Sequence, residues 1–268
     1  MRAARAEVDL DAVAHNVAVL RDRVAPAELC AVVKADGYGH GAIAVGQAAL
    51  EAGATWLAVA LVEEAAVLRK AGVTAPILLL SEPRRDDFDV AARYDLRLAV
   101  YTPEGVDAAA AEGRPLAVHL KVNTGMNRVG CRPDQVVDLA RRITKRPELH
   151  LEALWTHCAV ADEPDHPFTT EQLDRFDAVV AQLEAEGLRP ALLHAANSAA
   201  GIAHPRARHD LVRAGIAVYG IPPAPGLDGL IDLRPALRLT AEVSMVKRVA
   251  SGERVSYGLR HAFDRETT

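Results

Sequence analysis

The sequence has few of the features that mark membrane, secreted or nucleic-acid-binding proteins. Its 268 residues carry a formal net charge of −5, with acidic and basic residues mixed, so no basic stripe is available to neutralise a phosphate backbone. No apolar run approaches the ~20 residues of a membrane helix, and the first residues, MRAARAEVDLDAV, lack the apolar core of a signal peptide. We therefore expect no nucleic-acid partner, no membrane segment and a cytoplasmic location.

Cysteine is also scarce. The three cysteines, Cys30, Cys131 and Cys158, lack the close pairs of a disulfide framework or a zinc site. We expect buried or half-buried thiols and no metal centre. The chain shows no internal repeat, low-complexity tract or flexible linker, and its length suits one large domain, alone or with a fragment of another.

Short apolar runs alternate with Ala-rich helical patterns, which is typical of βα units around a parallel sheet. The predicted strands are Leu29–Val33, Thr55–Ala60, Pro76–Leu80, Arg97–Val100, Leu116–Val122, Leu151–His157, Ala191–His194 and Leu211–Arg213. The predicted helices are Leu10–Val24, Gly41–Ala52, Glu63–Ala71, Pro103–Glu112, Pro133–Lys145 and Thr169–Glu186. Eight such strands favour a closed (β/α)₈ TIM barrel over an open sheet, and such a barrel takes ~250 residues.

The pattern changes near Leu230, where apolar and polar residues alternate with Gly and Ser breaks. This predicts one or two antiparallel strands of a new domain, so we assign residues 1–232 to the barrel and 233–268 to the start of an incomplete β-domain. An isolated hairpin is marginal in water. The segment is therefore expected to need partner strands.

A single lysine, Lys34, stands where the first predicted strand, LCAVV, ends, and the following turn contains Gly37, Gly39 and Gly41. In a barrel of this kind the functional groups gather at the C-terminal ends of the strands. An amine desolvated on one side there suits Schiff-base formation with a carbonyl. Taken alone, however, the lysine is better explained as the solvent end of a strand, because single motifs are weak signals.

Five segments, each near the end of a predicted strand, resemble segments of alanine racemases, in the order of that family. They are VVKADGYGHG (32–41), HLKVNTGMNRVG (119–130), LWTHCAVADE (154–163), HAANSAAG (194–201) and VRAGIAVYG (212–220). The resemblance implies that Lys34 binds pyridoxal 5′-phosphate as a Schiff base and then serves as one proton-transfer base. It implies that Tyr38 contacts the cofactor phosphate, whereas the alternative is simple packing under the loop.

Asn197 and Ser198 open a short Ala-rich helix after the seventh strand and are both typical helix caps. Capping is one interpretation, and phosphate binding at a helix N-terminus is the other. By resemblance, the backbone of Gly215 and Ile216 completes the phosphate site.

Arg213 ends the eighth strand and, by resemblance, donates to the pyridine nitrogen of the cofactor. A permanently charged arginine favours the unprotonated ring, which delocalises less carbanion charge. The alternative is a salt bridge with Asp210 or a neighbouring carboxylate. His157 is expected to orient Arg213 or the catalytic tyrosine described below, Tyr257. The alternative is that His157 is only a structural group.

By resemblance, Arg128 contacts the cofactor's phenolic oxygen and the substrate carboxylate, tasks that suit its bidentate fork. Lys121 matches a lysine that is carbamylated in some family members and then pairs with this arginine. Racemisation needs a second base on the opposite face of the α-carbon. The family's second base is a tyrosine in a VSYG stretch of the other subunit of a homodimer, and VSYG at residues 255–258 places Tyr257 in that role.

The main hypothesis is thus a pyridoxal-phosphate-dependent racemase that interconverts L- and D-alanine, with serine as another possible substrate, and supplies D-alanine for peptidoglycan. Because the family continues well beyond Thr268, we expect a truncated form, inactive if the missing part is essential. The alternative is a non-catalytic single-barrel cofactor-binding protein, which would have no use for the VSYG stretch. A related barrel decarboxylase acting on basic amino acids is a third, less similar, family.

Overall fold

The computed structural model describes residues 4–227 and 229–268, which form two compact units. Val8–Leu237 form the barrel unit, and residues 4–7 together with Arg238–Thr268 form the second unit. The boundary therefore falls five residues later than the predicted one at residue 232. The second unit also takes residues 4–7, because β1 (Ala4–Val8) pairs with β10 (Leu237–Ala241).

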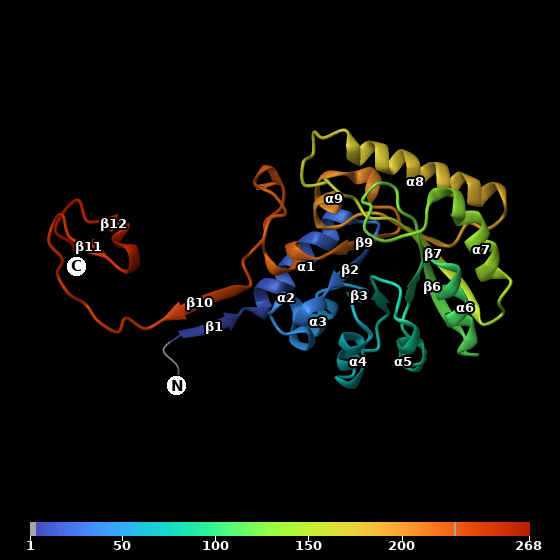
Figure 1. The fold of residues 1–268 in the computed structure, drawn as a ribbon, viewed down its shortest axis with the longest axis horizontal. Coiled ribbons are helices and arrows are strands. Elements are labelled where there is room, and N and C mark those ends of the chain that lie inside the picture. The colour runs from blue at the N-terminus through green and yellow to red at the C-terminus, as the bar shows by residue number, and fades with distance from the viewer. Residues whose placement is uncertain (1–3, 228) are drawn as a thin grey trace. The chain divides into compact units, whose positions relative to one another are not determined.

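Eight parallel strands close the barrel in chain order, as predicted (Figure 1). They are β2 (Glu28–Val32), β3 (Trp56–Val59), β4 (Ile77–Leu79), β5 (Leu98–Val100), β6 (Leu116–Lys121), β7 (Leu149–Trp155), β8 (Leu192–His194) and β9 (Leu211–Ala214). Two four-stranded ladders, β4-β3-β2-β9 and β5-β6-β7-β8, meet at two seams. A parallel bridge from Leu78 to Arg97 joins β4 to β5. Beside β8, the amide of Arg213 donates to the carbonyl of Ala196 at 3.1 Å.

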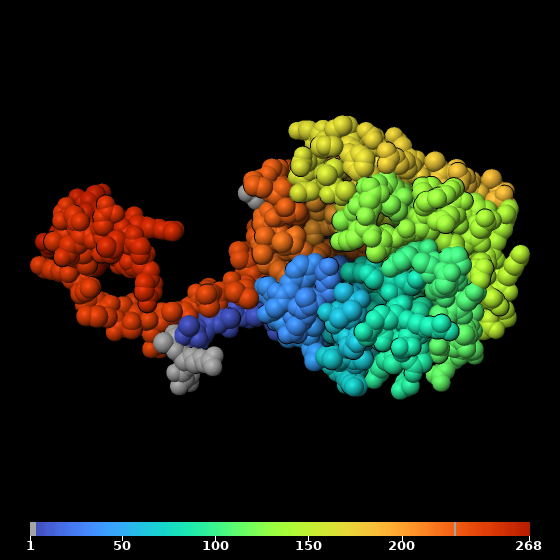
Figure 2. Space-filling view, viewed as in Figure 1, coloured from blue at the N-terminus to red at the C-terminus, as the bar shows by residue number. Residues whose placement is uncertain are grey.

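The helices surround the strands. They are α1 (Leu10–Val24), α2 (Lys34–Tyr38), α3 (Ala42–Glu51), α4 (Val62–Lys70), α5 (Phe88–Arg93), α6 (Pro103–Ala111), α7 (Val136–Thr144), α8 (Phe168–Ala185) and α9 (Ser198–Ala203). Short 3₁₀ turns are η1 (Arg85–Asp87), η2 (Pro133–Gln135), η3 (Pro205–Ala207), η4 (Ile216–Tyr219), η5 (Pro225–Leu227) and η6 (Tyr257–Leu259). On the visible face of the barrel unit, residues coloured from blue through green to yellow follow one another around the outside (Figure 2).

Local sequence explains where these helices begin and which face they bury. Asp9 caps α1 by accepting a hydrogen bond from the Ala12 amide at 3.0 Å, and Thr102 caps α6, whose first residue is Pro103. On α1, the apolar residues at helical spacing are buried: Val13, Val17, Leu20 and Val24. The predicted helices are present, whereas α5 was not predicted because only Phe88 and Ala91 of its six residues are buried.

The alternation of side chains along each strand divides the core into two layers. On β2, Leu29 and Ala31 pack outward against the helices, while Cys30 and Val32 face inward. Inward residues of β2, β3 and β4 are mainly apolar and include Trp56 and Leu78. The interior next to β6, β8 and β9 instead holds buried polar side chains of these strands, namely His119, Lys121, His194 and Arg213. The barrel interior is therefore polar next to β6, β8 and β9.

The second unit contains the strand pairs β1–β10 and β11–β12, where β11 (Arg254–Val255) and β12 (His261–Ala262) are antiparallel. β10 and β11 lie in the segment predicted to be strands. Leu239, Val243 and Met245 are more than 70% exposed. In the described parts of both units, no helix has the length and apolar character required to cross a membrane, and all three cysteines are buried free thiols.

Candidate active site

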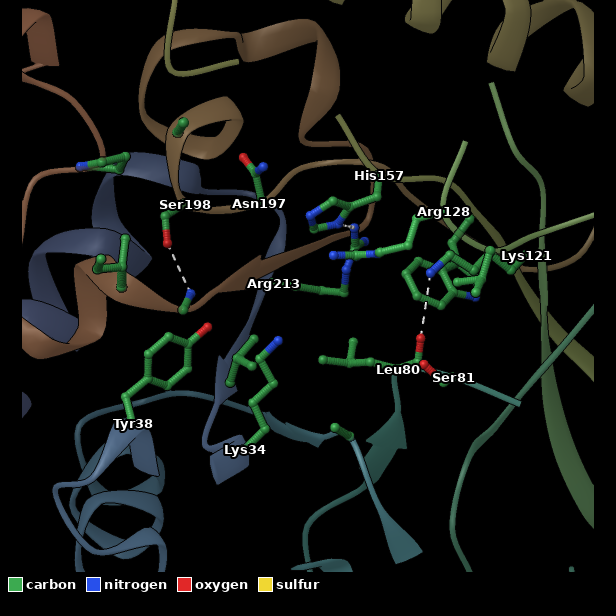
Figure 3. A pocket seen from close by; sticks show the side chains of 18 of the residues that line it. Lys34, Tyr38, Leu80, Ser81, Lys121, Arg128, His157, Asn197, Ser198 and Arg213 are labelled. Carbon is green, nitrogen blue, oxygen red and sulfur yellow. Dashed lines mark hydrogen bonds between the residues drawn. The ribbon is translucent and has the colours of Figure 1, made fainter. Parts of the chain in front are cut away.

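A pocket of about 570 Å³ opens where β2, β4, β6, β7 and β9 end (Figure 3). It brings together ten of the eleven residues predicted from the sequence: Lys34, Tyr38, Lys121, Arg128, His157, Asn197, Ser198, Arg213, Gly215 and Ile216. The eleventh, Tyr257, begins η6 in the second unit, and its side chain is fully exposed. The pocket therefore assembles predicted residues that are up to 182 positions apart in the chain, as Lys34 and Ile216 are.

Lys34 reaches the pocket through an unusual turn. Ala35, Asp36 and Gly37 have φ angles of 52°, 51° and 62°, and Tyr38 has a φ of 53°, so α2 contains a left-handed turn. This conformation costs roughly 1–2 kcal/mol per non-glycine residue. A carboxylate offsets part of that cost at each end, since Asp36 accepts from the Ala42 amide at 2.9 Å and Glu64 accepts from the Ala35 amide at 2.6 Å. The turn leaves Lys34 pointing into the pocket, with Tyr38 beside it (Figure 3).

A concave surface lies beneath the Tyr38 hydroxyl. A Cβ atom added to Gly215 would come within 2.7 Å of Tyr38 Oη, so only glycine leaves this space open. The Gly215 amide donates to Ser198 Oγ at 2.9 Å. Asn197 caps α9 by accepting from the Ala200 amide at 3.0 Å, which supports the capping interpretation of this residue.

Arg213 is a buried cation held by several acceptors. Its Nη2 donates to the carbonyls of Thr156 and Ala195, and its Nη1 donates to His194 Nδ1 at 2.6 Å. Its Nε is buried and has no hydrogen-bond partner within the described residues. Among the described residues Arg213 forms no salt bridge with Asp210 or a neighbouring carboxylate, since its hydrogen bonds go to backbone carbonyls and histidine nitrogens, and Asp210 accepts from the Leu193 amide.

Positive charges crowd the pocket and alter its protonation. Burial, followed by the charges of Arg213, Arg128 and Lys34, lowers the pKa of Lys121 to about 7. Its Nζ lies 3.9 Å from the centre of the Trp155 ring and donates to the Leu80 carbonyl at 3.4 Å (Figure 3). Lys121 is therefore a lysine that is partly neutral near pH 7.

His157, which lines the pocket, is neutral. Burial and the charge of Arg213 lower the pKa of His157 well below its ordinary value. As a neutral ring, His157 can accept from Arg213 Nη2 at its Nδ1, 3.1 Å away. This contact matches the expectation that His157 orients Arg213.

Several residues of the site were not singled out from the sequence. Trp155 stacks on His194 with ring centres 5.2 Å apart, and Arg213 lies over the same indole. Leu80, Ser81 and Asp162 also line the pocket. A signal for part of this surface was present, because the inward face of β6 carries His119 and Lys121 at alternate positions, where a barrel normally carries branched apolar residues.

The comparisons with known proteins agree with one another. The model of the alanine racemase N-terminal domain matches residues 8–223. The alanine racemase of Symbiobacterium thermophilum is 47% identical over 96% of this chain and 70% of its own length. That of Thermobifida fusca is 44% identical over 98% of this chain and 72% of its own length. The chain belongs to the alanine racemase family.

The fold supports the family assignment independently. The crystal structure of alanine racemase from a D-cycloserine-producing Streptomyces lavendulae superposes with a TM-score of 0.90 at 40% identity, covering 100% of this chain and 72% of the other. The matches extend beyond the barrel unit, which favours a racemase over a single-barrel binding protein. As a member of the alanine racemase family, the chain is an isomerase of the racemase class.

Proposed function

We propose that this protein interconverts L- and D-alanine with pyridoxal 5′-phosphate held in the barrel pocket. The observation that carries the proposal is that Lys34 and Arg213 line one cavity, and that the buried Nε of Arg213 has no hydrogen-bond partner among the described residues. A buried N–H without an acceptor is costly. An aromatic nitrogen placed opposite Arg213 would accept that hydrogen bond and relieve the cost.

The residues at the other end of the pocket fit a phosphate group. The Tyr38 hydroxyl, the Ser198 hydroxyl and the backbone of Gly215 and Ile216 converge at the start of α9 and η4. Backbone N–H groups at helix starts lack intrahelical acceptors and favour anions. Lys34 would hold the aldehyde carbon between the phosphate end and Arg213.

When bound, the cofactor withdraws electrons from the substrate's α-carbon and so makes its proton easier to remove. Lys34 takes or returns that proton on one face of the α-carbon. Arg128 presents its guanidinium to the substrate carboxylate, and Arg213 remains a charged donor because burial lowers its pKa only to about 10. The resemblance assigns the opposite face to Tyr257, contributed by a second copy of the chain in a homodimer.

Lys121 has a further proposed role. A neutral amine reacts with carbon dioxide to give a carbamate and a proton, and a pKa of about 7 makes that amine available. The carbamate would carry a negative charge next to Arg128, so three neighbouring cations would gain a counter-charge. We further propose a cytoplasmic location and a supply of D-alanine for peptidoglycan, both by resemblance to the family.

The test is loss of circular dichroism from L-alanine in the presence of the protein and added cofactor. We expect the wild-type protein to remove the signal, Lys34→Ala to be inactive, and Lys70→Ala, an exposed lysine at the end of α4, to behave as wild type. No turnover by a protein that shows cofactor absorbance at Lys34 would leave only binding. Preferred turnover of serine would change the substrate, and release of carbon dioxide from lysine or ornithine would overturn the reaction class.

A further inference from the structure

A line of hydrogen-bonded side chains runs through the polar half of the barrel interior and ends on Arg213. His194 Nδ1 lies 2.6 Å from Arg213 Nη1, and His194 Nε2 lies 3.0 Å from His119 Nδ1. His119 Nε2 in turn lies 2.8 Å from Glu152 Oε2. Both histidine rings are fully buried.

Only one arrangement of protons satisfies every contact in this line. Arginine has no acceptor, so Arg213 must donate to His194 Nδ1. The proton of a neutral His194 ring is then on Nε2 and is donated to His119 Nδ1. The proton of His119 is likewise on Nε2 and is donated to the Glu152 carboxylate, which has none of its own to give.

The charge states agree with this arrangement. Burial lowers the pKa of both His119 and His194, with the charge of Arg213 adding to the effect, so both rings are neutral. Burial opposes the ionisation of Glu152, but the His119 hydrogen bond and the cations around it outweigh this and hold its pKa below the usual value. Other charged groups that face the line are Arg97, whose Nε lies 3.6 Å from Glu152, and Lys121.

A purely space-filling role does not account for the line. Elsewhere the interior is filled by apolar side chains such as Cys30, Val32 and Leu78, which need no polar partners. Two buried imidazoles are costly unless each ring nitrogen is satisfied. The benefit must therefore come from what the line does to its last member, Arg213.

We propose that Glu152, His119 and His194 are positioning residues that fix the protonation of the line and hold Arg213 as a donor with its free Nε–H facing the pocket. Glu152 sets the direction of hydrogen-bond donation, because an ionised carboxylate can only accept. Each histidine must then donate through Nε2 and accept through Nδ1. The consequence for the cofactor ring rests on the proposed function. The proton arrangement itself does not, and can be measured without cofactor.

The first test is long-range ¹H–¹⁵N NMR on protein labelled with ¹⁵N-histidine, with signals assigned through His119→Phe and His194→Phe. Among the ten histidines, these two should be neutral with the proton on Nε2 at pH 7. A charged ring, or a proton on Nδ1 of either ring, would overturn the proposal.

The second test compares substitutions at the far end of the line. Glu152→Leu removes the acceptor and should change the ¹⁵N shifts of both rings. It should lower kcat for alanine about tenfold, by analogy with the loss of a hydrogen-bond partner behind a metal ligand. Glu152→Gln keeps an acceptor oxygen and should restore both the Nε2 protons and most of kcat. Glu28→Gln is the matched control, because Glu28 accepts from Thr55 and Trp56 at the same end of the barrel without joining the line.

A fall in kcat with the ¹⁵N shifts of both rings unchanged would mean a general structural loss. It would contradict the proposal that Glu152 acts through the two histidines. Absence of cofactor absorbance in the wild-type protein would instead contradict the proposed function and leave the NMR result standing. The absorbance spectrum of cofactor-loaded Glu152→Leu should also shift from that of wild type, because the ring nitrogen would face a less fixed donor.

Discussion

At the scale of single residues, the pocket concentrates positive charge. Lys34, Lys121, Arg128 and Arg213 all line it, with Asp162 as the carboxylate among the lining residues. A cofactor phosphate and a substrate carboxylate would both enter as counter-ions. Burial, with the same crowding of cations as a smaller cause, lowers the pKa of Lys121 to about 7.

The titration of Lys121 predicts how stability depends on pH. Between the folded pKa of about 7 and the unfolded value of 10.5, the unfolded chain binds the proton and the folded chain does not. The free energy of unfolding should therefore rise with pH in this window, by about 1 kcal/mol per unit from this residue. Urea unfolding of wild type and Lys121→Met between pH 7 and 9, in buffer free of carbon dioxide, measures the difference.

Parallel pH curves for the two proteins would contradict the prediction. Added bicarbonate provides a second comparison at fixed pH. If the Lys121 amine is carbamylated, added bicarbonate should raise the free energy of unfolding of the wild-type protein and leave that of Lys121→Met unchanged.

Gly215 allows another residue-level prediction. In Gly215→Ala the new methyl group would displace the Tyr38 hydroxyl, which lies 2.7 Å from the added atom. We expect the Kd for pyridoxal phosphate to rise about tenfold, equivalent to about 1.4 kcal/mol. Absorbance titration measures it, and Gly226→Ala, where the added atom meets nothing within 4 Å, is the control. Equal affinity in both variants would show that Tyr38 does not contact the phosphate.

The resemblance of the strand-end segments to a known family was enough to predict most of the residues that line the pocket, but not their hydrogen bonds. Arg213 was recognised as a ring partner, yet its contacts with His194 and Trp155 depend on which strands are neighbours and on their register. His119 and Glu152 lie below the pocket, away from the strand ends where functional residues are sought. Such contacts follow from closure of the barrel and are not encoded in any local pattern.

At the scale of elements, the left-handed turn of α2 is the main local strain. Ala35 occupies a conformation that glycine adopts without penalty, and its side chain is exposed. We predict that Ala35→Gly raises the free energy of unfolding by about 1 kcal/mol. Ala44→Gly, at an exposed position inside the right-handed helix α3, should lower it by about 1 kcal/mol.

Denaturant unfolding of the two alanine-to-glycine variants side by side provides the measurement. Opposite signs are expected because the substitution is the same and only the backbone conformation differs. A loss of stability in both would mean that the turn is not left-handed in solution.

The strands were predicted more reliably than the short elements between them. Apolar runs such as LCAV and WLAV are bounded by polar turns and were recognised from the sequence. The helix α5 has too few apolar residues to show a period, and β1 was not predicted because only its pairing with β10 makes it a strand. Long-range pairing of this kind leaves no local signal.

At the scale of the whole molecule, the proposed chemistry needs a residue that the barrel unit does not contain. Tyr257 belongs to the second unit, where its side chain is fully exposed. The chain spans 70–72% of the length of the relatives compared above. If two copies of the chain share their sites, mixing two inactive variants should restore activity.

Mixing two inactive variants tests the shared site. Lys34→Ala and Tyr257→Phe should each be inactive alone. Co-refolded in equal amounts, they should recover about a quarter of wild-type activity, because half of a random two-fold dimer population has one site with both residues intact. Mixing Lys34→Ala with Lys34→Ala,Tyr257→Phe is the control and should recover nothing. No recovery in the first mixture would place both bases in one copy or remove Tyr257 from the reaction.

The pairing of β1 with β10 also sets an order of events during synthesis. Residues 4–8 leave the ribosome before their partner at residues 237–241, which is made only after the barrel sequence. At about 5–20 residues per second, β1 would stay unpaired for roughly 10–50 s. Throughout that interval the nascent chain would expose a strand edge, and the charged side chains of Arg5 and Glu7 within it help to keep it soluble.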